Sequence, residues 1–231
     1  MWHVEVGHVL FGGVMELDHI FLFVENADRA MLSAGDFGLV ETYRRVHPGQ
    51  GTANICYAFE NAFLELIWLT NREEAESAAI RRTRLAERAD WHRAGTCPFG
   101  IAWRGQEGEQ ELVETWPYTP PYLPEGMSIP VATISEDPSL PMFFQSPGRF
   151  APRDWPDERK GQLQSALGYT TIEDIELQVP RGQGIPDELK VLSGTGLFSL
   201  GRAESWEVKL MIGKEDGTRA TLSLPFWELD D

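Results

Sequence analysis

Short runs of hydrophobic residues, separated by turn-forming residues, dominate the first part of the chain. The runs are rich in β-branched and aromatic residues and are too short for helices, so they predict strands. Their ranges are 17–24, 41–46, 52–60 and 62–69. Between the first two runs, Asn26 is placed to cap a helix that extends to about Asp36. The pattern therefore predicts a β-α-β-β-β unit, here called the first unit, over 15–70.

A charged stretch follows at 71–95, in which Ala, Leu and Ile are interspersed. Thr70 to Glu73 has the spacing of a capping box and Gly95 would end a helix, so we expect a helical connector with a solvated charged face. A second unit is predicted over 96–146. Its strands are expected at 98–104, 129–134 and 142–145, and its crossover helix at 109–116.

The same order of elements returns in a C-terminal unit at 167–231. Residues 171–179 alternate between apolar and polar, as a half-exposed strand does, and Asp216-Gly217 is a strong hairpin signal. A helix is expected at 186–192, with strands at 196–200, 205–212 and 219–224. Residues 146–166, rich in Pro, Arg and Asp, are interpreted as a surface excursion.

These patterns predict an α+β fold. Repeated βαβββ units would form curved, mostly antiparallel sheets around a cleft, with the first and second units and their connector making one domain at 15–146. The C-terminal unit at 167–231 would add a third βαβββ-like element to this domain.

Composition narrows the classes of partner and the cellular compartment that we expect for the protein. The formal net charge of −16 repels phosphate backbones and anionic lipid, which argues against nucleic-acid and membrane partners. No run of about 18 apolar residues exists. Cys56 and Cys97 form no CxxC pair and are interpreted as buried thiols, so we expect a reducing, cytoplasmic setting. Residues 1–14 lack the basic start of a secretory signal and are expected to be an upstream extension before Met15 or a peripheral strand.

Four strings in the first two units carry a resemblance to a known family. They are Leu17-Asp18-His19-Ile20, the loop 47–54 (HPGQGTAN), Phe63-Leu64-Glu65-Leu66 and the segment 140–145 (LPMFFQ). Together they resemble the glyoxalase-like branch of the vicinal oxygen chelate superfamily. That resemblance implies paired βαβββ modules curled into a cleft, with a histidine on the first strand and a glutamate on the last strand binding a divalent metal.

His19 and Glu65 stand at those two positions. Glu65 lies within an apolar run, and a buried carboxylate needs a cation, a hydrogen-bond network or a raised pKa. Imidazole plus carboxylate makes half of a site for Zn, Fe, Mn or Ni. The alternative is a Glu65 paired with an arginine and a core His19 bonded to backbone. In the second unit the ligands that the resemblance implies are missing, since Phe99 or Gly100 and Phe144 or Gln145 stand there.

The loop 47–54 is the other candidate for a site. Gly49 and Gly51 would let backbone amides approach a ligand, with Thr52 beside them. His47 could act as general acid or base, or as a third metal ligand, and Asn54 offers both a donor and an acceptor. The alternative is a hairpin turn that merely needs glycine. Further expected contacts to substrate come from the cleft wall, at Trp103, Phe144 and Gln145.

Three functions remain open from the sequence. The first is a small-molecule enzyme of lyase, isomerase or dioxygenase type, with His47 and Glu65 as catalytic groups and His19 and Glu65 as metal ligands. The second is a metal-free protein of the same fold that binds or sequesters a small molecule, which the missing second-unit ligands favour. The third is a scaffold in which the C-terminal unit or 146–166 contacts a protein partner or a second copy in a homodimer.

Overall fold

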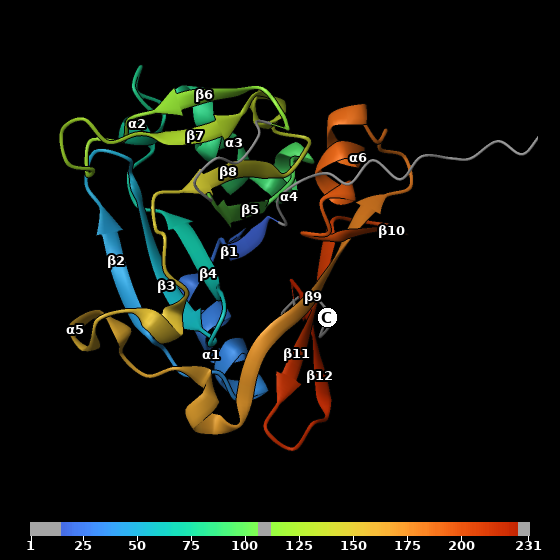
Figure 1. Ribbon diagram of the computed structural model, residues 1–231. Coiled ribbons are helices and arrows are strands. Elements are labelled where there is room, and N and C mark those ends of the chain that lie inside the picture. Colours follow the sequence, from blue (N-terminus) through green and yellow to red (C-terminus); the bar gives the residue numbers. More distant parts are fainter. Residues whose placement is uncertain (1–14, 106–111, 226–231) are drawn as a thin grey trace, which may run out of the picture.

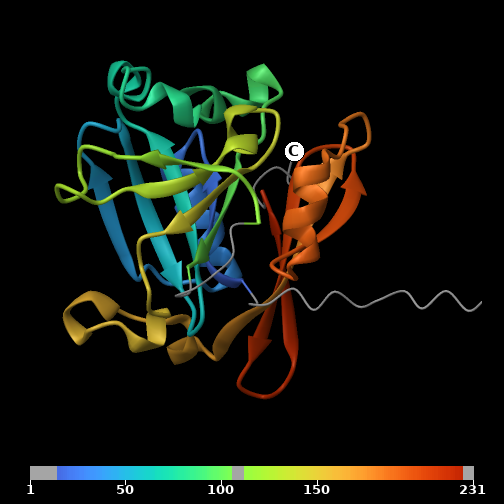
Figure 2. The ribbon, with the colours of Figure 1, turned by 45° about the horizontal axis from the view of Figure 1, so that its top comes forward.

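The computed structural model describes residues 15–105 and 112–225, so the expectation for residues 1–14 lies outside the described part. Two sheets organise it, one of eight strands and one of four (Figure 1). The larger sheet curls around a hollow, and the smaller sheet packs beside its outer face (Figure 2). None of the helices in the described ranges has the length and apolar run that crossing a bilayer needs.

The first unit has the predicted order of elements. Its bounds are β1 (Glu16–Phe23), α1 (Ala27–Phe37), β2 (Tyr43–His47), β3 (Thr52–Ala58) and β4 (Phe63–Leu69). As expected, Asn26 caps α1, because its side-chain oxygen accepts a hydrogen bond from the Arg29 backbone N–H at 3.0 Å. Gly38 ends the helix in the left-handed conformation (φ 96°) that glycine adopts at little cost.

The connector is helical, but it is broken into short pieces. These are α2 (Arg72–Ala75), the 3-10 turn Arg81–Thr83, α3 (Leu85–Ala89) and α4 (Trp91–Ala94). Its face is also less solvated than predicted. Arg88 is fully buried and donates to backbone carbonyls of Cys97, Ser135 and Leu140, so it binds α3 to the loop before β8. Burial lowers the pKa of Arg88 to about 10.

The second unit supplies four strands, β5 (Phe99–Arg104), β6 (Thr115–Tyr118), β7 (Ile129–Ala132) and β8 (Met142–Ser146). The prediction of a crossover helix at 109–116 is wrong for the end of that range, because Thr115 and Trp116 are in a strand. Residues 109–111 lie outside the described residues. Pro117 fits in β6 because β6 is an edge strand, where a missing N–H leaves no interior ladder bond unmade.

The strand order of the large sheet shows that the two units are built alike. That order is β2-β3-β4-β1-β5-β8-β7-β6. In each half the first strand of the unit pairs in parallel with its last strand, β1 with β4 and β5 with β8. The halves join where β1 and β5 pair antiparallel at the centre. One continuous curved surface results, with α1 against its outer face.

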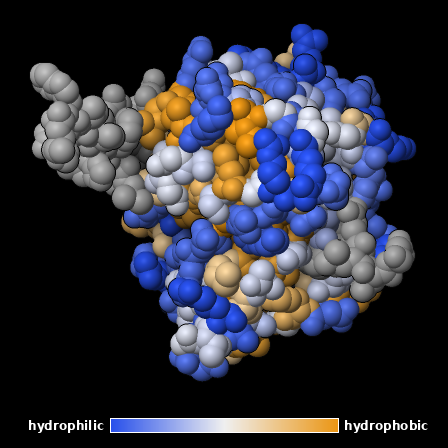
Figure 3. All heavy atoms as spheres, turned by 90° about the vertical axis from the view of Figure 1, so that its right-hand side faces the viewer, coloured by the Kyte–Doolittle hydropathy of each residue, from blue (hydrophilic) through white to orange (hydrophobic). Residues whose placement is uncertain are grey.

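The C-terminal unit comprises β9 (Tyr169–Pro180), α6 (Asp187–Gly194), β10 (Ser199–Ala203), β11 (Glu207–Lys214) and β12 (Arg219–Leu224). The predicted order of elements is present, but the sheet order β10-β9-β11-β12 differs from that of the first unit, so it is not a third copy of the same module. Phe198 stacks on Phe143 of β8 at 5.6 Å, which ties this unit to the outer face of the large sheet. Seen from the side of this unit, apolar residues gather in patches at the surface between hydrophilic ones (Figure 3).

Residues 146–166 are more than a surface excursion. The segment contains the 3-10 turn Pro152–Asp154 and α5 (Asp157–Lys160), and it runs past one end of the large sheet (Figure 1). Trp155 is buried with its ring 5.8 Å from Tyr43 and 5.7 Å from Phe63. Gln164 anchors the segment by exchanging two hydrogen bonds with the Val40 backbone. The segment therefore forms one wall of the hollow.

Candidate functional site

The hollow of the large sheet holds a cavity of about 410 Å³. Its volume falls in the range of about 300–1,000 Å³ that small-molecule sites occupy. The residues that line it come from the inner faces of both units, the loop 119–128 and the segment 146–155. From the first unit they are Asp18, His19, Phe21, Tyr43, Arg45, His47, Gln50, Asn54, Phe63, Glu65 and Ile67.

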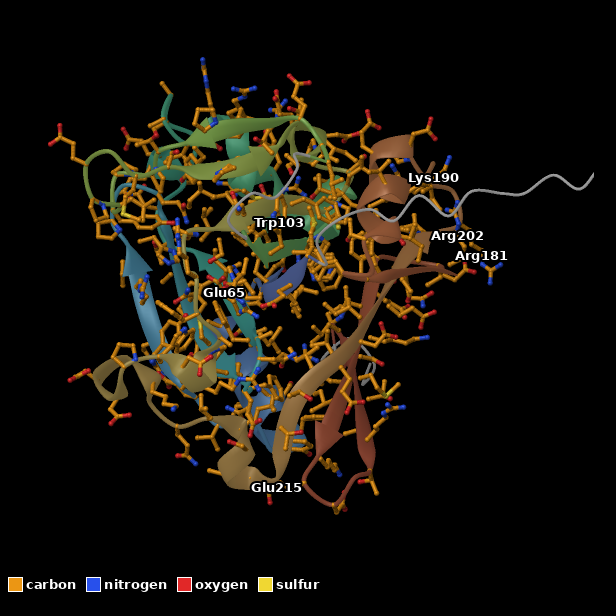
Figure 4. The ribbon with its side chains drawn as sticks, in the orientation of Figure 1. Glu65, Trp103, Arg181, Lys190, Arg202 and Glu215 are labelled. Atoms are coloured by element: carbon orange, nitrogen blue, oxygen red, sulfur yellow. The ribbon has the colours of Figure 1, made fainter. Side chains whose placement is uncertain are left out.

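His19 and Glu65 lie together in this cavity, as predicted (Figure 4 labels Glu65). Because β1 and β4 pair in parallel with Phe21 opposite Glu65, the two side chains reach the same face of the sheet. His19 Nε2 is 3.4 Å from Glu65 Oε2. The His19 ring is held in place by stacking on Phe63, at 4.4 Å between centroids, and by an edge contact with Phe144 at 5.3 Å.

Asp18 completes this cluster through an irregularity in β1. The register of β1 on β5 shifts between Leu17 and His19, so Asp18 is an extra residue that both follows the outer Leu17 and precedes the inner His19. Its carboxylate accepts a hydrogen bond from His19 Nδ1 at 2.6 Å and lies 3.4 Å from an Arg104 nitrogen. Burial favours the neutral acid, but His19 and Arg104 outweigh it and hold the pKa of Asp18 below its ordinary value.

Asn54 links Glu65 to the loop 47–54. One N–H of its amide donates to Glu65 Oε1 at 2.6 Å, and the same nitrogen is 3.5 Å from His47 Nε2. This geometry favours the His47 tautomer with its proton on Nδ1, which then donates to Thr52 Oγ1 at 2.9 Å. The buried Asn54 Oδ1 has no hydrogen-bond partner within the described residues. Asn54 therefore orients both Glu65 and His47.

The chain of hydrogen bonds continues to the second unit. Gln50 donates to Thr52 Oγ1 at 2.7 Å and accepts from the Tyr118 hydroxyl at 2.7 Å. This contact joins the β2–β3 turn to β6, the two edges of the curved sheet. His47 lies beneath Tyr122, at 5.0 Å between rings, and burial lowers its pKa from the ordinary histidine value. His47 is therefore a neutral imidazole at pH 7.

The glycines of the loop do not form the predicted anion-binding concavity. Gly49 and Gly51 do not line the cavity, and the Gly49 N–H is already bonded to the Glu74 carboxylate at 2.9 Å. Both have positive φ, and a Cβ at Gly51 would collide with the Asn71 backbone carbonyl. Thr52 is fully buried beneath the surface of the cavity. The hairpin-turn alternative explains the glycines, and Thr52 positions His47.

Two expected cleft-wall residues lie on the other face of the sheet. Trp103 belongs to the outer hydrophobic cluster, and Gln145 pairs with it across β5 and β8, so neither lines the cavity (Figure 4 labels Trp103). The prediction for both is wrong because alternate residues of a strand face opposite ways. Phe144, the neighbour of Gln145, does line the cavity, as expected.

Sequence reasoning missed several polar residues that line the cavity, among them Tyr43, Arg45, Tyr118 and Tyr122. Tyr43 and Arg45 share the inner face of β2 with His47, a period-two signal that was present in the sequence. Tyr118 and Tyr122 come from the second unit and reach the first unit only through the curl of the sheet, for which the sequence gives no signal. Burial, with Glu65 adding to it, raises the pKa of Tyr122, so its hydroxyl remains a donor at neutral pH.

The second unit contributes an almost entirely apolar wall. Apart from Tyr118 and Ser146, its inner-face residues that line the cavity are Ile129, Met142 and Phe144, with Leu123 and Met127 from the loop after β6 and Leu85 from α3. All of these apolar side chains except Met127 belong to one hydrophobic cluster with Phe21 and Ile67 of the first unit. The cavity thus has one polar side and one apolar side.

The residues present do not fit the divalent metal that the resemblance implies. His19 Nε2 and Glu65 Oε2 are close enough to share an ion, but metal centres in proteins commonly need three or more protein ligands. Opposite them stands Phe144, and no three His, Cys, Asp or Glu side chains of the described ranges converge where one ion could bind. His47, the third ligand considered from the sequence, is bonded to Asn54 and Thr52 instead.

Comparisons with known proteins were made for sequence and for structure. Among solved structures, a methylmalonyl-CoA epimerase in complex with methylmalonyl-CoA and ammonium is 14% identical with a TM-score of 0.40, and the match covers 60% of this chain and 99% of that one. The methylmalonyl-CoA epimerase of Mycobacterium tuberculosis gives 14% and 0.41, covering 60% and 91%. A hypothetical protein of Bacillus halodurans C-125 gives 17% and 0.40, covering 60% and 99%.

No curated protein matches the chain. Residues 17–111 match the family described as "Glyoxalase-like domain". This range holds β1, His19, the loop 47–54, Glu65 and β5. Over residues 17–111 the chain is therefore similar to the glyoxalase-like domain family.

Proposed function

We propose that the cavity binds a small molecule and exchanges a proton with it through His19 and Glu65, as an isomerase or lyase does. The observation that supports this most is the buried pair itself, His19 Nε2 and Glu65 Oε2 at 3.4 Å on the surface of a ligand-sized cavity. Such a pair is costly to bury and adds little to folding unless it is used.

In this proposal Glu65 removes a proton from a carbon next to a carbonyl group. Asn54 holds one carboxylate oxygen of Glu65, which leaves Oε2 to face the ligand and His19. Asp18 fixes the His19 ring through Nδ1, so its Nε2 atom can pass a proton to or from Glu65 or the ligand. In this proposal either Glu65 or His19 can therefore carry the proton.

The Tyr122 hydroxyl is the group suited to the negative charge that forms on the substrate oxygen. Its raised pKa keeps it protonated, and it lines the cavity next to His47. A donor aimed at a developing oxyanion in a site with little water stabilises the transition state more than the ground state. Tyr122 is thereby assigned the role of oxyanion donor.

The test is proton exchange in D2O. Small carbonyl compounds that carry a C–H bond next to the carbonyl are incubated with the full chain, and the loss of that proton signal is followed by NMR. We expect exchange with the wild type, and a rate at least ~100-fold lower for Glu65→Gln, since general-base catalysis contributes about 10²–10⁴-fold. Glu65→Gln should keep its ligand affinity.

A second function is favoured by the apolar wall of Ile129, Met142 and Phe144. A metal-free binding protein needs such a wall and no proton transfer. The same experiment separates the two functions. Compounds that bind in the cavity but exchange no faster with the wild type than with Glu65→Gln would contradict the enzyme and leave the binding protein.

A further inference from the structure

Arg45 is an unpaired cation on the wall of an otherwise acidic site. It lies on the inner face of β2 between Tyr43 and His47 and is exposed, and no carboxylate of the described residues is within 4 Å of its guanidinium. Its neighbour Arg44 points to the other face and forms an ion pair with Glu41. In a chain with a net charge of −16, a positive group left open at a cavity is uncommon.

The position of Arg45 favours recognition of an anion. Its guanidinium carbon is 5.7 Å from the Tyr43 ring centroid, a cation–π contact that limits where the side chain can go. A guanidinium offers a planar pair of N–H donors that matches the two oxygens of a carboxylate. A ligand carboxylate that is buried in the cavity beside it would form a stronger hydrogen-bonded ion pair. Arg45 is thus a built anchor for one charged end of a ligand.

The opposite wall determines the rest of the ligand. Ile129, Met142 and Phe144 offer only apolar contacts, and Phe150, 65% exposed, and Met127, 40% exposed, extend the apolar lining. A fully charged or sugar-like ligand would leave its polar groups unpaired against this wall. An apolar body with a single anionic end fits both sides.

Resting on the proposed function, we propose that the substrate is a small carboxylate with an apolar body, whose carboxylate binds Arg45. The carboxylates of Glu65 and Asp18 repel such a ligand, so its anionic end lies at Arg45 and its neutral reactive carbon lies at Glu65. Asp18 is already paired with Arg104 and hydrogen-bonded to His19. The remaining repulsion comes from Glu65.

The test measures the affinity of benzoate, hexanoate and 4-phenylbutyrate, each against its neutral amide, by calorimetry with the full chain. We expect at least one carboxylate to bind about tenfold more tightly than its amide, as a hydrogen bond between charged groups predicts. Arg45→Gln should remove that preference. The matched control, Arg44→Gln, should keep it, and Glu65→Gln should strengthen carboxylate binding while proton exchange stops.

The outcomes separate this inference from the proposed function. If amides and carboxylates bind the wild type equally, or if Arg44→Gln removes the preference as fully as Arg45→Gln, the carboxylate assignment is wrong and the proton-transfer proposal survives. If none of the six compounds binds at about 10 mM or below, the inference is also overturned. The D2O experiment on neutral carbonyl compounds then decides the proposed function by itself.

Discussion

The two units of the large sheet share a topology but not a chemistry. β4 and β8 occupy matching places in the strand order, and so do β1 and β5. Glu65 lies on β4, whereas Phe144 takes the corresponding inner position on β8. His19 lies on β1, and the residue opposite it on β5 is Ala102. The comparison shows that the same strand topology can occur twice in one sheet while only one of the two units carries the reactive groups.

The two walls differ in the interactions that stabilise their side chains when they are buried. The polar wall is stabilised by a chain of hydrogen bonds, from Asp18 through Glu65 and Asn54 to Gln50. The apolar wall needs only close packing, to which Phe21 and Phe144 contribute across the centre of the sheet. Substitutions should therefore act on the two walls in different ways.

Asp18→Asn should have the largest effect on stability. It removes the buried carboxylate that pairs with Arg104 and accepts the His19 hydrogen bond, and breaking a buried ion pair costs about 3–5 kcal/mol. Phe144→Leu in the apolar wall is the control, with an expected cost below about 1.5 kcal/mol. Urea unfolding at pH 7 measures both.

The pH dependence of Asp18→Asn sharpens this prediction. Because the folded-state pKa of Asp18 lies below its ordinary value of 3.8, the stabilisation is present above that pH and is lost as the pH falls further. The difference between wild type and variant should therefore shrink in acid. A difference that stays constant down to pH 2 would show that charge is not its cause.

Phe144→Leu should next separate binding from folding. Phe144 lines the cavity, and Phe143 beside it packs on the outer face, so Phe143→Leu removes a similar volume from the other side. We expect Phe144→Leu to weaken 4-phenylbutyrate binding by about three- to tenfold, from the lost apolar contact. Phe143→Leu should leave the affinity unchanged. Equal losses in both variants would place the apolar body of the ligand elsewhere.

His47 should give a smaller effect that depends on pH. Burial lowers its folded-state pKa below the ordinary value of 6.5, so between those two values the unfolded chain binds the proton more readily. Wild-type stability should therefore fall as the pH drops below 6.5, by at most about 1.4 kcal/mol for each unit of pKa shift. His47→Gln should lose less over the same range in urea unfolding. An identical pH profile would mean that His47 titrates normally.

Divalent metal should have the smallest effect. With two donors opposite Phe144, we expect ~100 µM Zn²⁺ or Mn²⁺ to stabilise the wild type by less than about 0.3 kcal/mol. Thermal unfolding with and without the ion measures this. A larger rise that disappears in His19→Ala would instead restore the metal centre implied by the resemblance.

Features set by strand alternation could be predicted from the sequence. His19 and Glu65 meet because each lies on the inner face of a strand. The motifs within 17–66 that resemble the family place those two strands in one unit. The same alternation was misapplied to Trp103 and Gln145, because nothing in the sequence says which face of β5 and β8 is inner. Tyr122 could not be found, since it reaches the site through the curl of the whole sheet.

Asp18 was beyond reach for a different reason. A regular strand would point it away from His19, and only the register shift against β5 brings it inward. Arg88 was equally hidden, because its carbonyl partners come from a loop about 50 residues further along the chain. Long-range partners of single polar residues leave no periodic signature.

The extra residue in β1 has a consequence for how this site can change. A regular strand can offer a cavity only every second side chain, whereas β1 offers two consecutive ones. The number of residues between Leu17 and Ile20 therefore matters to the site as much as the identity of Asp18 and His19. Deleting one residue there would keep the imidazole or the carboxylate in the hollow, but not both.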